Sequence, residues 1–485
     1  MVDFKFTSVA QNTRLEDAGP IKFGTSGWRG VLAKEVTFQR VARLSRSMAF
    51  LIKQHSSSKK ITIRLGYDTR FLSRVFAELM ATIFANAGIN VDIEDDVCTT
   101  PALVYCTMKG PYDLGVNITA SHNPFYFHGV KIITSSGLAG NSLTKNIERL
   151  CLLDQSNGPL DIYSQHEGNV REVSARRDYV EHILEFLDVE SIRESAPFVV
   201  YDPLYGCASK CFGALFSKLG VATSSIHGYP DPWFGGLLEA APSPHTLKDL
   251  SREVIRSNAL LGLASDGDGD RFGVIDFDGS FVKNNDVIAL LVDYLYKEKK
   301  LKGPVVRSVS SSTIIDRIAN NYKESAIESP VGFKNITSIM GKCGANVGVE
   351  ESGGFSYAPN LPDKDGIMAD MLVLEMRLKS GRSIKDELEL LYNRYGRFYH
   401  ERFDLPVGDN SGESKFNHFV NMLPKALPGS SMIKDSTVDG FKRFYENDSW
   451  ILLRRSGTEN RIRIYVETKL IEVFNATVNW VTSLT

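Results

Sequence analysis

A serine followed at once by a histidine stands at the centre of the segment Thr119-Ala120-Ser121-His122-Asn123-Pro124. Apolar runs at 114–118 and 130–133 flank this segment, and their composition indicates buried strands. The Asn-Pro pair is a loop signal, so the segment should turn between the two strands. Ser121 is therefore a candidate nucleophile at the end of a strand. Taken alone, the six residues are more simply a polar turn, and the rest of the chain has to decide.

Three aspartates, Asp266, Asp268 and Asp270, alternate with glycine further along the chain. Side chains two residues apart in an extended backbone point the same way, and glycine lets the backbone curl, so the three carboxylates should converge. Oxygen ligands without histidine or cysteine suit Mg²⁺. A calcium-binding EF-hand loop is excluded, because its glycine and glutamate positions hold Arg271 and Phe277. A solvated acidic turn is the alternative, but three clustered carboxylates repel one another without a cation.

Two further loops have the composition of ligand sites. Arg454, Ser456, Gly457 and Thr458 combine a guanidinium, two hydroxyls and a glycine, which suits a phosphate site built from backbone N–H groups and an arginine fork. A plain β-turn fits this loop equally well. The second loop set comprises Glu350, Ser352 and Lys364. A carboxylate and a hydroxyl can grip vicinal sugar hydroxyls, and a lysine can meet their charge or a phosphate.

A phosphorylated Ser121 explains the combination of a serine, a metal loop and a phosphate loop better than the serine nucleophile of a hydrolase does. The chain has no GxSxG segment, and His122 is too close in sequence to serve Ser121 as the base of a triad. A phosphoserine carries about −1.5 to −2 charges. Mg²⁺ at the aspartate loop would neutralise that charge and make the phosphoryl group more electrophilic.

The elements that must position these loops alternate between apolar strands and amphipathic helices. This alternation predicts α/β domains with mixed or parallel sheets, whose ligand loops follow the carboxyl ends of strands. A polar stretch, 154–177, is expected to be a connection after the first unit. Three such units could be divergent copies, although no crisp sequence repeat is visible. The expected strands include 61–67, 91–93, 198–201, 221–226, 259–264, 305–309, 347–349, 450–453 and 462–467, and the expected helices 71–87, 208–218, 245–257, 287–296, 312–320, 367–379 and 416–423.

Composition bounds the kind of protein. The chain of 485 residues has a net charge of −2 and is 43% hydrophobic, which is typical of a globular protein of three or four domains. A balanced charge does not indicate a nucleic-acid partner. The six cysteines form no CxxC pairs, and neither a signal peptide nor a membrane-spanning run is visible, so a cytoplasmic protein without a membrane partner is expected.

Four separated motifs in this order resemble the α-D-phosphohexomutase superfamily, and within it the phosphoglucomutase/phosphomannomutase branch. They are Gly24-Thr25-Ser26-Gly27-Trp28-Arg29-Gly30, Thr119 to Pro124, Asp266 to Arg271, and Arg454 to Glu459, with Glu350 to Gly354 and Lys364-Asp365-Gly366 as a fifth set. The resemblance covers nearly the whole chain. It implies three similar α/β domains with mixed sheets and a smaller C-terminal TBP-like α+β domain, in a heart shape around a central cleft. The expected domains are 1–165, 166–283, 284–396 and 397–485.

The resemblance also implies a role for each motif. Ser121 would be the phosphoserine, and Asp266, Asp268 and Asp270 would hold Mg²⁺ together with one phosphoserine oxygen. Arg29, His122 and Lys131 would surround the transferring group, with Lys131 a candidate general base. The residues expected to bind substrate are Arg271, Lys334, Glu350, Ser352, Lys364, Arg454, Ser456, Gly457 and Thr458.

The activity implied is a Mg²⁺-dependent interconversion of hexose 1-phosphate and hexose 6-phosphate. It would pass through the phosphoserine and a 1,6-bisphosphate, with glucose 1,6-bisphosphate as intermediate and activator. Glucose is the expected sugar, mannose a second one, and the expected state is a monomer or weak dimer. Phosphoglucosamine or phosphopentose mutase is the alternative of the same class, and a non-catalytic phosphosugar-binding homologue is the alternative of another class.

The chain departs from the pattern of the superfamily at several positions. Arg455 and Asn460 stand where proline is usual in the phosphate loop, and Val349 replaces a glycine that is common before the sugar-binding glutamate. Gly354 stands where some bacterial members have a histidine, so the role of that histidine does not carry over to this chain.

Overall fold

The structure is a computed structural model that describes residues 19–55, 60–154, 168–407, 412–456 and 461–482. The chain divides into two compact units. The first unit comprises Met1–Gly273 and Asp365–Ile367, and the second comprises Val274–Lys364 and Met368–Thr485. Residues Asp365–Ile367 thus belong to the first unit, although the chain on both sides of them belongs to the second.

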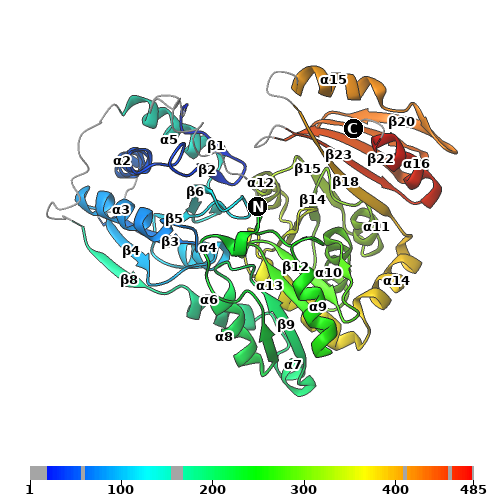
Figure 1. Cartoon of the computed structure of the whole chain (residues 1–485), viewed down its shortest axis with the longest axis horizontal. Coiled ribbons are helices and arrows are strands. Elements are labelled where there is room, and N and C mark those ends of the chain that lie inside the picture. Colours follow the sequence, from blue (N-terminus) through cyan, green and yellow to red (C-terminus); the bar gives the residue numbers. More distant parts are fainter. Residues whose placement is uncertain (1–18, 56–59, 155–167, 408–411, 457–460, 483–485) are drawn as a thin grey trace. The chain divides into compact units, whose positions relative to one another are not determined.

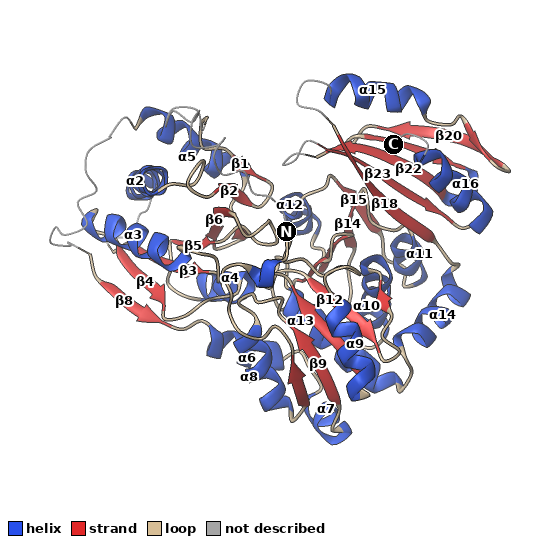
Figure 2. Cartoon of the chain, viewed as in Figure 1, coloured by secondary structure: helices blue, strands red, loops and turns tan. Residues whose placement is uncertain are grey.

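A mixed eight-stranded sheet in the first unit has the order β1-β2-β6-β5-β3-β4-β8, with β7 paired to β6. Strands β5, β3, β4 and β8 run parallel, whereas β6 is antiparallel to β5. From β2 to β5, helices and strands alternate along the chain (Figures 1 and 2). The bounds are β1 Phe23–Gly24, β2 Gly27–Val31, α2 Phe38–His55, β3 Thr62–Tyr67, α3 Ser73–Asn86, β4 Asn90–Glu94, α4 Thr100–Lys109, β5 Leu114–Ile118, β6 Phe127–Thr134, β7 Gly137–Leu138, α5 Asn141–Leu153 and β8 Val170–Val173.

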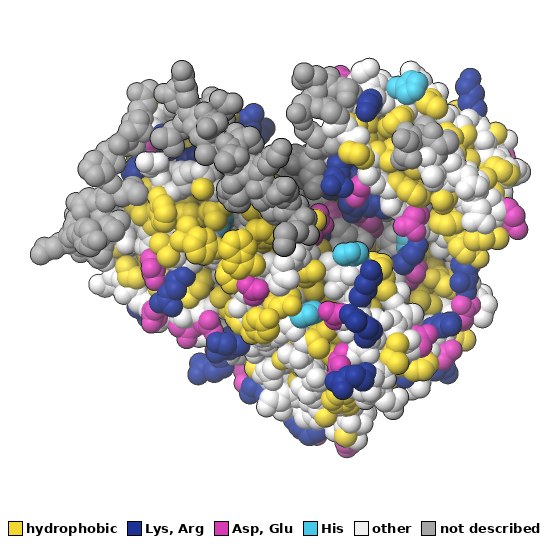
Figure 3. All heavy atoms as spheres, in the orientation of Figure 1, with side chains coloured by type: hydrophobic (Ala, Val, Ile, Leu, Met, Phe, Trp, Pro, Cys, Tyr) yellow, Lys and Arg dark blue, Asp and Glu magenta, His cyan; other side chains and the backbone are white. Residues whose placement is uncertain are grey.

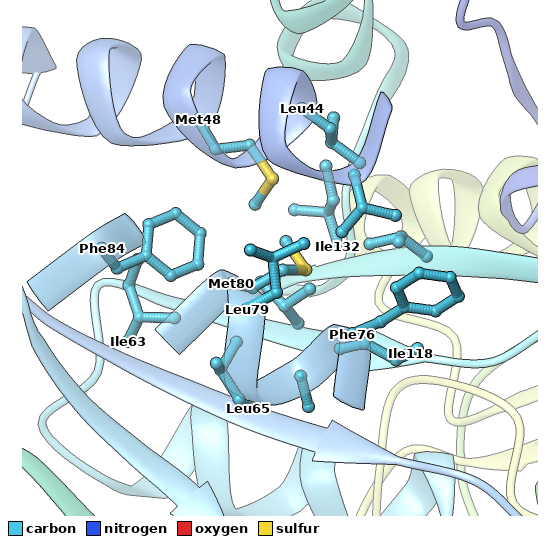
Figure 4. Close-up of a cluster of buried hydrophobic side chains, with 14 of the residues drawn as sticks. Leu44, Met48, Ile63, Leu65, Phe76, Leu79, Met80, Phe84, Ile118 and Ile132 are labelled. Carbon is cyan, nitrogen blue, oxygen red and sulfur yellow. The ribbon is translucent and has the colours of Figure 1, made fainter. Parts of the chain in front are cut away.

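The core beside this sheet follows from the spacing of apolar residues on α3. Phe76, Met80 and Phe84 are four residues apart, so they share one helix face, and all three are buried. Burial of each such side chain stabilises the fold by about 1.5–3 kcal/mol. Figure 4 shows them beside buried residues of α2 and of the sheet, among them Ile118 at the end of β5. The core therefore fixes the strand that leads to Ser121.

The second sheet has the order β10-β9-β11-β12-β13. Strand β9 is parallel to β10 and β11, and β12 pairs antiparallel with β13. The bounds are α6 Arg176–Leu184, α7 Val189–Ser195, β9 Phe198–Asp202, α8 Ser209–Leu219, β10 Ala222–Ser225, the 3-10 helix η1 Phe234–Gly236, α9 Lys248–Ser257, β11 Leu261–Ser265, β12 Phe272–Asp276 and β13 Phe281–Val282.

The second unit contains a four-stranded sheet, β15-β14-β16-β17, and a six-stranded antiparallel sheet, β18-β23-β22-β21-β20-β19. The first part has α10 Asn284–Lys297, β14 Val305–Ser308, α11 Ile314–Asn321, β15 Ala326–Ser329, α12 Phe333–Cys343, β16 Val347–Glu350, β17 Gly354–Tyr357, α13 Gly366–Ser380 and α14 Ile384–Tyr395. The last part has β18 Tyr399–Pro406, α15 Gly412–Met422, β19 Ala426–Leu427, β20 Ser430–Ser436, β21 Phe441–Tyr445, η2 Glu446–Asp448, β22 Ser449–Arg455, β23 Arg461–Thr468 and α16 Ile471–Thr482.

One strand order recurs in the three α/β sheets: β4-β3-β5-β6, β10-β9-β11-β12 and β15-β14-β16-β17. In each sheet the third strand of this series ends at a candidate loop. The loops after β5, β11 and β16 contain Ser121, the three aspartates and Ser352, respectively. The shared order supports the interpretation of three divergent copies, which the sequence alone did not reveal.

The stretch 154–177 is not only a connection, because it contains strand β8, which pairs parallel to β4. The residues of β8 are mostly exposed, so this edge strand lacks the apolar run by which strands are recognised in a sequence. The four domain boundaries stay a prediction. Within the described residues, no helix is long and apolar enough to cross a membrane. Charged side chains of both signs are interspersed on the face drawn in Figure 3.

Candidate active site

Ser121 lies just beyond β5 in a left-handed backbone conformation. Its φ is 54°, a region that residues with a side chain seldom adopt and that costs of order 1–3 kcal/mol. Its backbone N–H donates to Thr119 Oγ1 at 2.8 Å, and the residue is fully buried. A strained, buried serine at a strand end favours a functional role over a plain polar turn.

The aspartate loop meets this serine within the first unit. Ser121 Oγ donates to Asp266 Oδ2 at 3.1 Å, whereas His122 Nδ1 is 3.5 Å from the same oxygen of Ser121. Gly267 permits the approach, since a Cβ there would lie 3.0 Å from the carbonyl oxygen of Ser121. The hydroxyl and the loop, 145 residues apart in the chain, therefore lie within hydrogen-bonding distance.

The three carboxylates converge as expected, but the backbone is a turn and not an extended run. Asp266 Oδ1 accepts from the N–H groups of Asp270 at 2.9 Å and Arg271 at 3.1 Å, which curls the loop. One oxygen of each aspartate lies within 4.8 Å of the others. Asp268 Oδ1 is buried and has no hydrogen-bond partner among the described residues. A buried set of hard oxygens with an unused lone pair fits Mg²⁺.

Lys131, on β6, is fully buried against the same carboxylates. Its Nζ is 2.5 Å from Asp268 Oδ2 and 2.7 Å from Asp270 Oδ2. Burial alone would lower the pKa of Lys131, but the two aspartates outweigh it and raise the pKa above its usual value. As the structure has it, Lys131 is an ammonium group at the centre of the site.

Two residues that the sequence analysis missed support this arrangement. Thr100 Oγ1 donates to Asp268 Oδ2 at 2.5 Å, and Asn117 Nδ2 donates to Thr100 Oγ1 at 2.9 Å. Thr100 begins α4, where Thr99 accepts from the N–H of Ala102 as the helix N-cap. A Thr-Thr-Pro sequence is typical of a helix start, but nothing in it pointed to an aspartate 168 residues away.

Two arginines named from the sequence also lie in the first unit. Arg29, on β2, donates from Nη1 to Asn123 Oδ1 at 2.6 Å, and burial lowers its pKa. Arg271 directly follows the aspartates, and its Nε is buried without a hydrogen-bond partner among the described residues. The backbone of Gly366 packs on Arg271, because a Cβ at position 366 would lie 2.2 Å from the Arg271 carbonyl oxygen.

The segment around Gly366 is held in the first unit by two further contacts. The hydroxyl of Tyr179 donates to Asp365 Oδ1 at 2.7 Å, and the N–H of Gly366 donates to the carbonyl of Gly269 at 3.3 Å. The Lys-Asp-Gly motif thus continues from Lys364 in the second unit into residues that pack on the aspartate loop.

The second unit contains the remaining candidates. Glu350 ends β16 and is buried; its Oε1 accepts from the N–H of Gly332 at 3.0 Å, and its Oε2 accepts from Ser352 Oγ at 3.0 Å. The structure therefore pairs Glu350 and Ser352, the two groups expected to bind sugar hydroxyls. Lys334 is the second residue of α12 and is partly exposed.

Gly354 explains how Lys364 is placed. A Cβ at position 354 would lie 3.0 Å from Lys364 Cδ and 3.0 Å from a ring carbon of Phe333, so the stem of Lys364 packs on the bare glycine. A histidine at this position would displace the lysine. The departure from the bacterial pattern is therefore matched to the packing of this chain.

Arg454 is anchored by a residue that the sequence did not single out. Its Nε donates to Asp439 Oδ2 at 2.8 Å, and the same oxygen accepts from the N–H of Val331 at 2.8 Å. Ser456 pairs with Arg461 through its backbone N–H at 2.9 Å, and Arg455 is exposed. Gly457, Thr458 and Asn460 lie outside the described residues.

Comparison with known proteins gives this geometry a context. Models described as phosphoglucomutase/phosphomannomutase alpha/beta/alpha domains I, II and III match residues 20–156, 177–279 and 283–395. A phosphoglucosamine/phosphogalactosamine mutase of Sulfurisphaera tokodaii is 30% identical over 94% of this chain and 97% of its own length. A phosphoglucomutase/phosphomannomutase of Thermococcus kodakarensis is 28% identical over 92% and 94%, respectively.

Solved structures agree. A candidate phosphomannomutase of Thermus thermophilus superposes with a TM-score of 0.83 at 27% identity, over 96% of this chain and 99% of its own. An N-acetylphosphoglucosamine mutase of Aspergillus fumigatus, solved with GlcNAc-6P and magnesium, shares the fold at a TM-score of 0.55 and 13% identity, over 98% and 97%. The predicted class, three α/β domains with mixed sheets and a fourth domain with an antiparallel sheet, is confirmed.

Proposed function

The chain belongs to the phosphoglucomutase/phosphomannomutase family, and from that premise we propose that it is a Mg²⁺-dependent phosphohexomutase acting through a phosphorylated Ser121. Its relatives are phosphomutases, which are isomerases. Glucose phosphates are the proposed substrates, with mannose phosphates second, and glucose 1,6-bisphosphate is the proposed intermediate and activator.

The observation that supports this proposal most is the contact of Ser121 Oγ with Asp266 at the edge of three converging carboxylates. Asp266, Asp268 and Asp270 would hold Mg²⁺, which would neutralise phosphate charge and polarise the phosphoryl group. A serine beside a buried acidic cluster is a poor place for an anion unless a cation is bound. The arrangement therefore suits a phosphoserine that exists together with a metal.

The other residues of the first unit would act on the transferring group directly. Arg29 lies within the same electrostatic neighbourhood as Asp268 and Asp270, and its guanidinium is oriented by Asn123. Lys131 would face the sugar oxygen and the phosphoryl group. Its base role requires that the carboxylates give up their hydrogen bonds to the ammonium in favour of another cation. His122 and Arg271 would complete the surroundings of the phosphate.

The second unit would recognise the sugar and the phosphate that is not being transferred. Glu350 and Ser352 would bind sugar hydroxyls, while Lys334 and Lys364 would meet the negative charge of the substrate. Arg454, Ser456, Gly457 and Thr458 would hold the distal phosphate through charge-assisted hydrogen bonds. Because the two phosphates of a 1,6-bisphosphate exchange places during the reaction, this set must accept the intermediate in both orientations.

A coupled assay with glucose, mannose, glucosamine and ribose 1-phosphates, with Mg²⁺ and with a chelator, tests the reaction and its sugar. Relatives named for glucosamine match as well as those named for glucose and mannose, so a preference for glucosamine 1-phosphate would reverse the sugar assignment. Absence of turnover with all four sugars in the presence of 1,6-bisphosphate would favour a non-catalytic phosphosugar-binding protein.

Intact-mass measurement and one variant test the nucleophile. The protein should carry one added phosphate after incubation with glucose 1,6-bisphosphate. Ser121→Ala should lack it and should lose turnover by at least about 10⁴-fold while still binding sugar phosphate. The matched control is Ser45→Ala, which removes another buried serine hydroxyl of the same domain, bonded to the carbonyl of Val41. Full activity in Ser121→Ala would refute the assignment.

A further inference from the structure

Arg70 is a buried arginine to which none of the roles above is assigned. It follows β3 in the segment Asp68-Thr69-Arg70, and its side chain is fully shielded from solvent. A buried guanidinium has to place five N–H groups, and each one left without an acceptor is costly. The positions of its acceptors therefore indicate what the side chain is for.

Four of the acceptors are backbone carbonyls between Ser121 and Phe127, that is, of the serine loop and of the first residue of β6. Each terminal nitrogen of Arg70 donates to two of them: Nη2 to Ser121 O at 2.6 Å and Asn123 O at 2.6 Å, and Nη1 to Pro124 O at 2.8 Å and Phe127 O at 3.0 Å. One planar group thus binds four of the seven carbonyls in the segment 121–127. A lysine has three donors in a tetrahedral arrangement and cannot reproduce this fork.

The arginine is itself held in place by Asp68. Its Nε lies 3.2 Å from Asp68 Oδ2, and its backbone N–H donates to Asp68 Oδ1 at 2.9 Å. Ser73 Oγ donates to the same Oδ1 at 2.5 Å and is 3.0 Å from His128 Nε2. Burial lowers the pKa of His128 to about 4, and its Nδ1 accepts from the N–H of Gly129. The neutral ring therefore donates to Ser73, and a continuous chain of hydrogen bonds supports Asp68.

An aromatic ring closes the other side of the guanidinium. The centre of the Phe234 ring is 4.8 Å from Arg70 Cζ, and Phe234 is fully buried. Such a cation–π contact stabilises the buried guanidinium and excludes water from this side of it. Phe234 also lies next to Gly267, so one residue packs on both the arginine and the aspartate loop.

This geometry accounts for the strained conformation of Ser121. A left-handed residue persists only where its surroundings determine its conformation, and here the carbonyl of Ser121 is fixed by Arg70 and its N–H by Thr119. With both peptide groups fixed, the side chain is directed to Asp266. The adjacent Asp68 balances the charge of Arg70, so its effect on Ser121 is one of geometry and not of long-range attraction.

We propose that Arg70 is a positioning residue for phosphoryl transfer, which holds the Ser121 loop so that Oγ faces the aspartate loop. The inference rests on the proposed role of Ser121 as the phosphorylated residue. It assigns to Arg70 no contact with substrate. Loss of the fork should therefore lower the rate of transfer to and from Ser121 and leave the recognition of sugar phosphate nearly intact.

The test is Arg70→Lys, compared with Arg64→Lys as a matched control. Arg64 is the other buried arginine of β3 and its end; it pairs with Glu94 and Tyr112, which lie outside the serine loop. Because a displacement of about 1 Å can cost about 100-fold, kcat of Arg70→Lys should fall about 100-fold with KM within about threefold of wild type. The control should retain kcat within about threefold. Equal falls in the two variants would overturn the proposal.

Amide hydrogen exchange of residues 121–127 in the full chain provides a measurement that does not depend on turnover. Exchange in this loop should be at least about tenfold faster in Arg70→Lys than in Arg64→Lys. Unchanged exchange would overturn the positioning role. If the wild type proves inactive as a mutase, the proposed function fails, and the exchange measurement still decides whether Arg70 orders the loop.

A second variant covers the case in which Arg70→Lys does not accumulate as a folded protein. Asp68→Asn keeps the size of the side chain and an oxygen for Ser73, but it removes the charged partner of the guanidinium. Its kcat should fall about tenfold, with faster exchange in residues 121–127. Wild-type kcat and exchange in Asp68→Asn would overturn the proposal.

Discussion

Each unit of the chain contains a lysine that is almost completely buried, and the pKa values of the two are shifted in opposite directions. Lys131 in the first unit has two aspartates within 2.7 Å, and its pKa is raised. Lys442 in the second unit donates to the carbonyl of Val309 at 2.7 Å and to Glu328 at 3.1 Å. Burial lowers the pKa of Lys442 to about 8, with the nearby Arg307 contributing. Burial is common to both lysines, so the number of carboxylates per cation determines the direction in which the pKa is shifted.

The two lysines differ in the ratio of carboxylates to cations around them. In the first unit, Lys131 pairs with Asp268 and Asp270, and Asp266 adds a third carboxylate to the cluster, so that a further cation can be held there. In the second unit, Glu328 is shared between Lys442 and Arg307, and the lysine lies 4.1 Å from the ring of Trp450. Lys442 is therefore a structural group, whereas Lys131 is the lysine that we propose for phosphoryl transfer.

The largest expected difference in activity is between the variants that lack one or the other of these lysines. Lys131→Met should lower kcat by about 10²–10⁴-fold, the range for loss of a proton-transferring group, and Lys442→Met should leave kcat nearly unchanged. The coupled assay at saturating Mg²⁺ and substrate provides the measurement. Similar losses in the two variants would contradict the distinction between the lysines.

The next effect concerns the hydroxyl beside Asp268. Thr100→Val keeps the shape of the side chain but removes its hydrogen bond, so the Mg²⁺ concentration for half-maximal activity should rise about 10–100-fold. Calorimetric titration with Mg²⁺ should show the same weakening without substrate. Thr100→Ser retains the hydroxyl and should bind Mg²⁺ like the wild type; a loss as large as in the valine variant would point to packing instead.

A smaller effect is expected in the second unit at Asp439, which holds Arg454. Asp439→Asn should raise KM for the sugar phosphate about tenfold with little change in kcat, since it weakens a charge-assisted hydrogen bond to a group proposed to bind the distal phosphate. The control is Asp435→Asn on the same sheet, whose partner is Arg443. A fall in kcat without a change in KM would place Arg454 in the chemistry.

The last expected effect is on stability and not on activity: it is the dependence of the free energy of unfolding on pH that Lys442 causes. Its folded pKa of about 8 lies below the unfolded value of about 10.4, so the unfolded chain binds the proton more tightly between these values. The free energy of unfolding should therefore rise across this window, by at most about 3 kcal/mol from this group. Denaturant melts at pH 7.5 to 10 should show this rise in the difference between wild type and Lys442→Met. A difference that does not vary with pH would refute the lowered pKa.

The sequence predicted those elements whose apolar pattern is local. The run 114–118 corresponds to β5, and 198–201 lies within β9, because both are buried strands with continuous apolar character. The polar edge strand β8 was missed because its residues are mostly exposed. A strand whose pairing is decided by a distant partner leaves little periodicity in its own residues.

The candidate site divides in the same way. Residue types and spacing predicted that Ser121 and the three aspartates would lie together, and the structure brings Ser121 Oγ to 3.1 Å from Asp266. The supporting residues Thr100, Asn117 and Arg70 could not be found, because what they do depends on contacts across the fold. The extended backbone predicted for the aspartate loop was wrong. Asp266 accepts the backbone N–H groups of Asp270 and Arg271, and these hydrogen bonds turn the chain.

The return of Asp365–Ile367 to the first unit has a consequence for biosynthesis. The rest of that unit ends at Gly273, so the ribosome must add about ninety more residues before the segment that packs on Arg271 is available. At a rate of synthesis of about 5–20 residues per second, the rest of the first unit is present for several seconds before residues 365–367 are made. A truncated chain that stops before Asp365 would leave Tyr179 and the backbone of Gly269 exposed where they are normally covered.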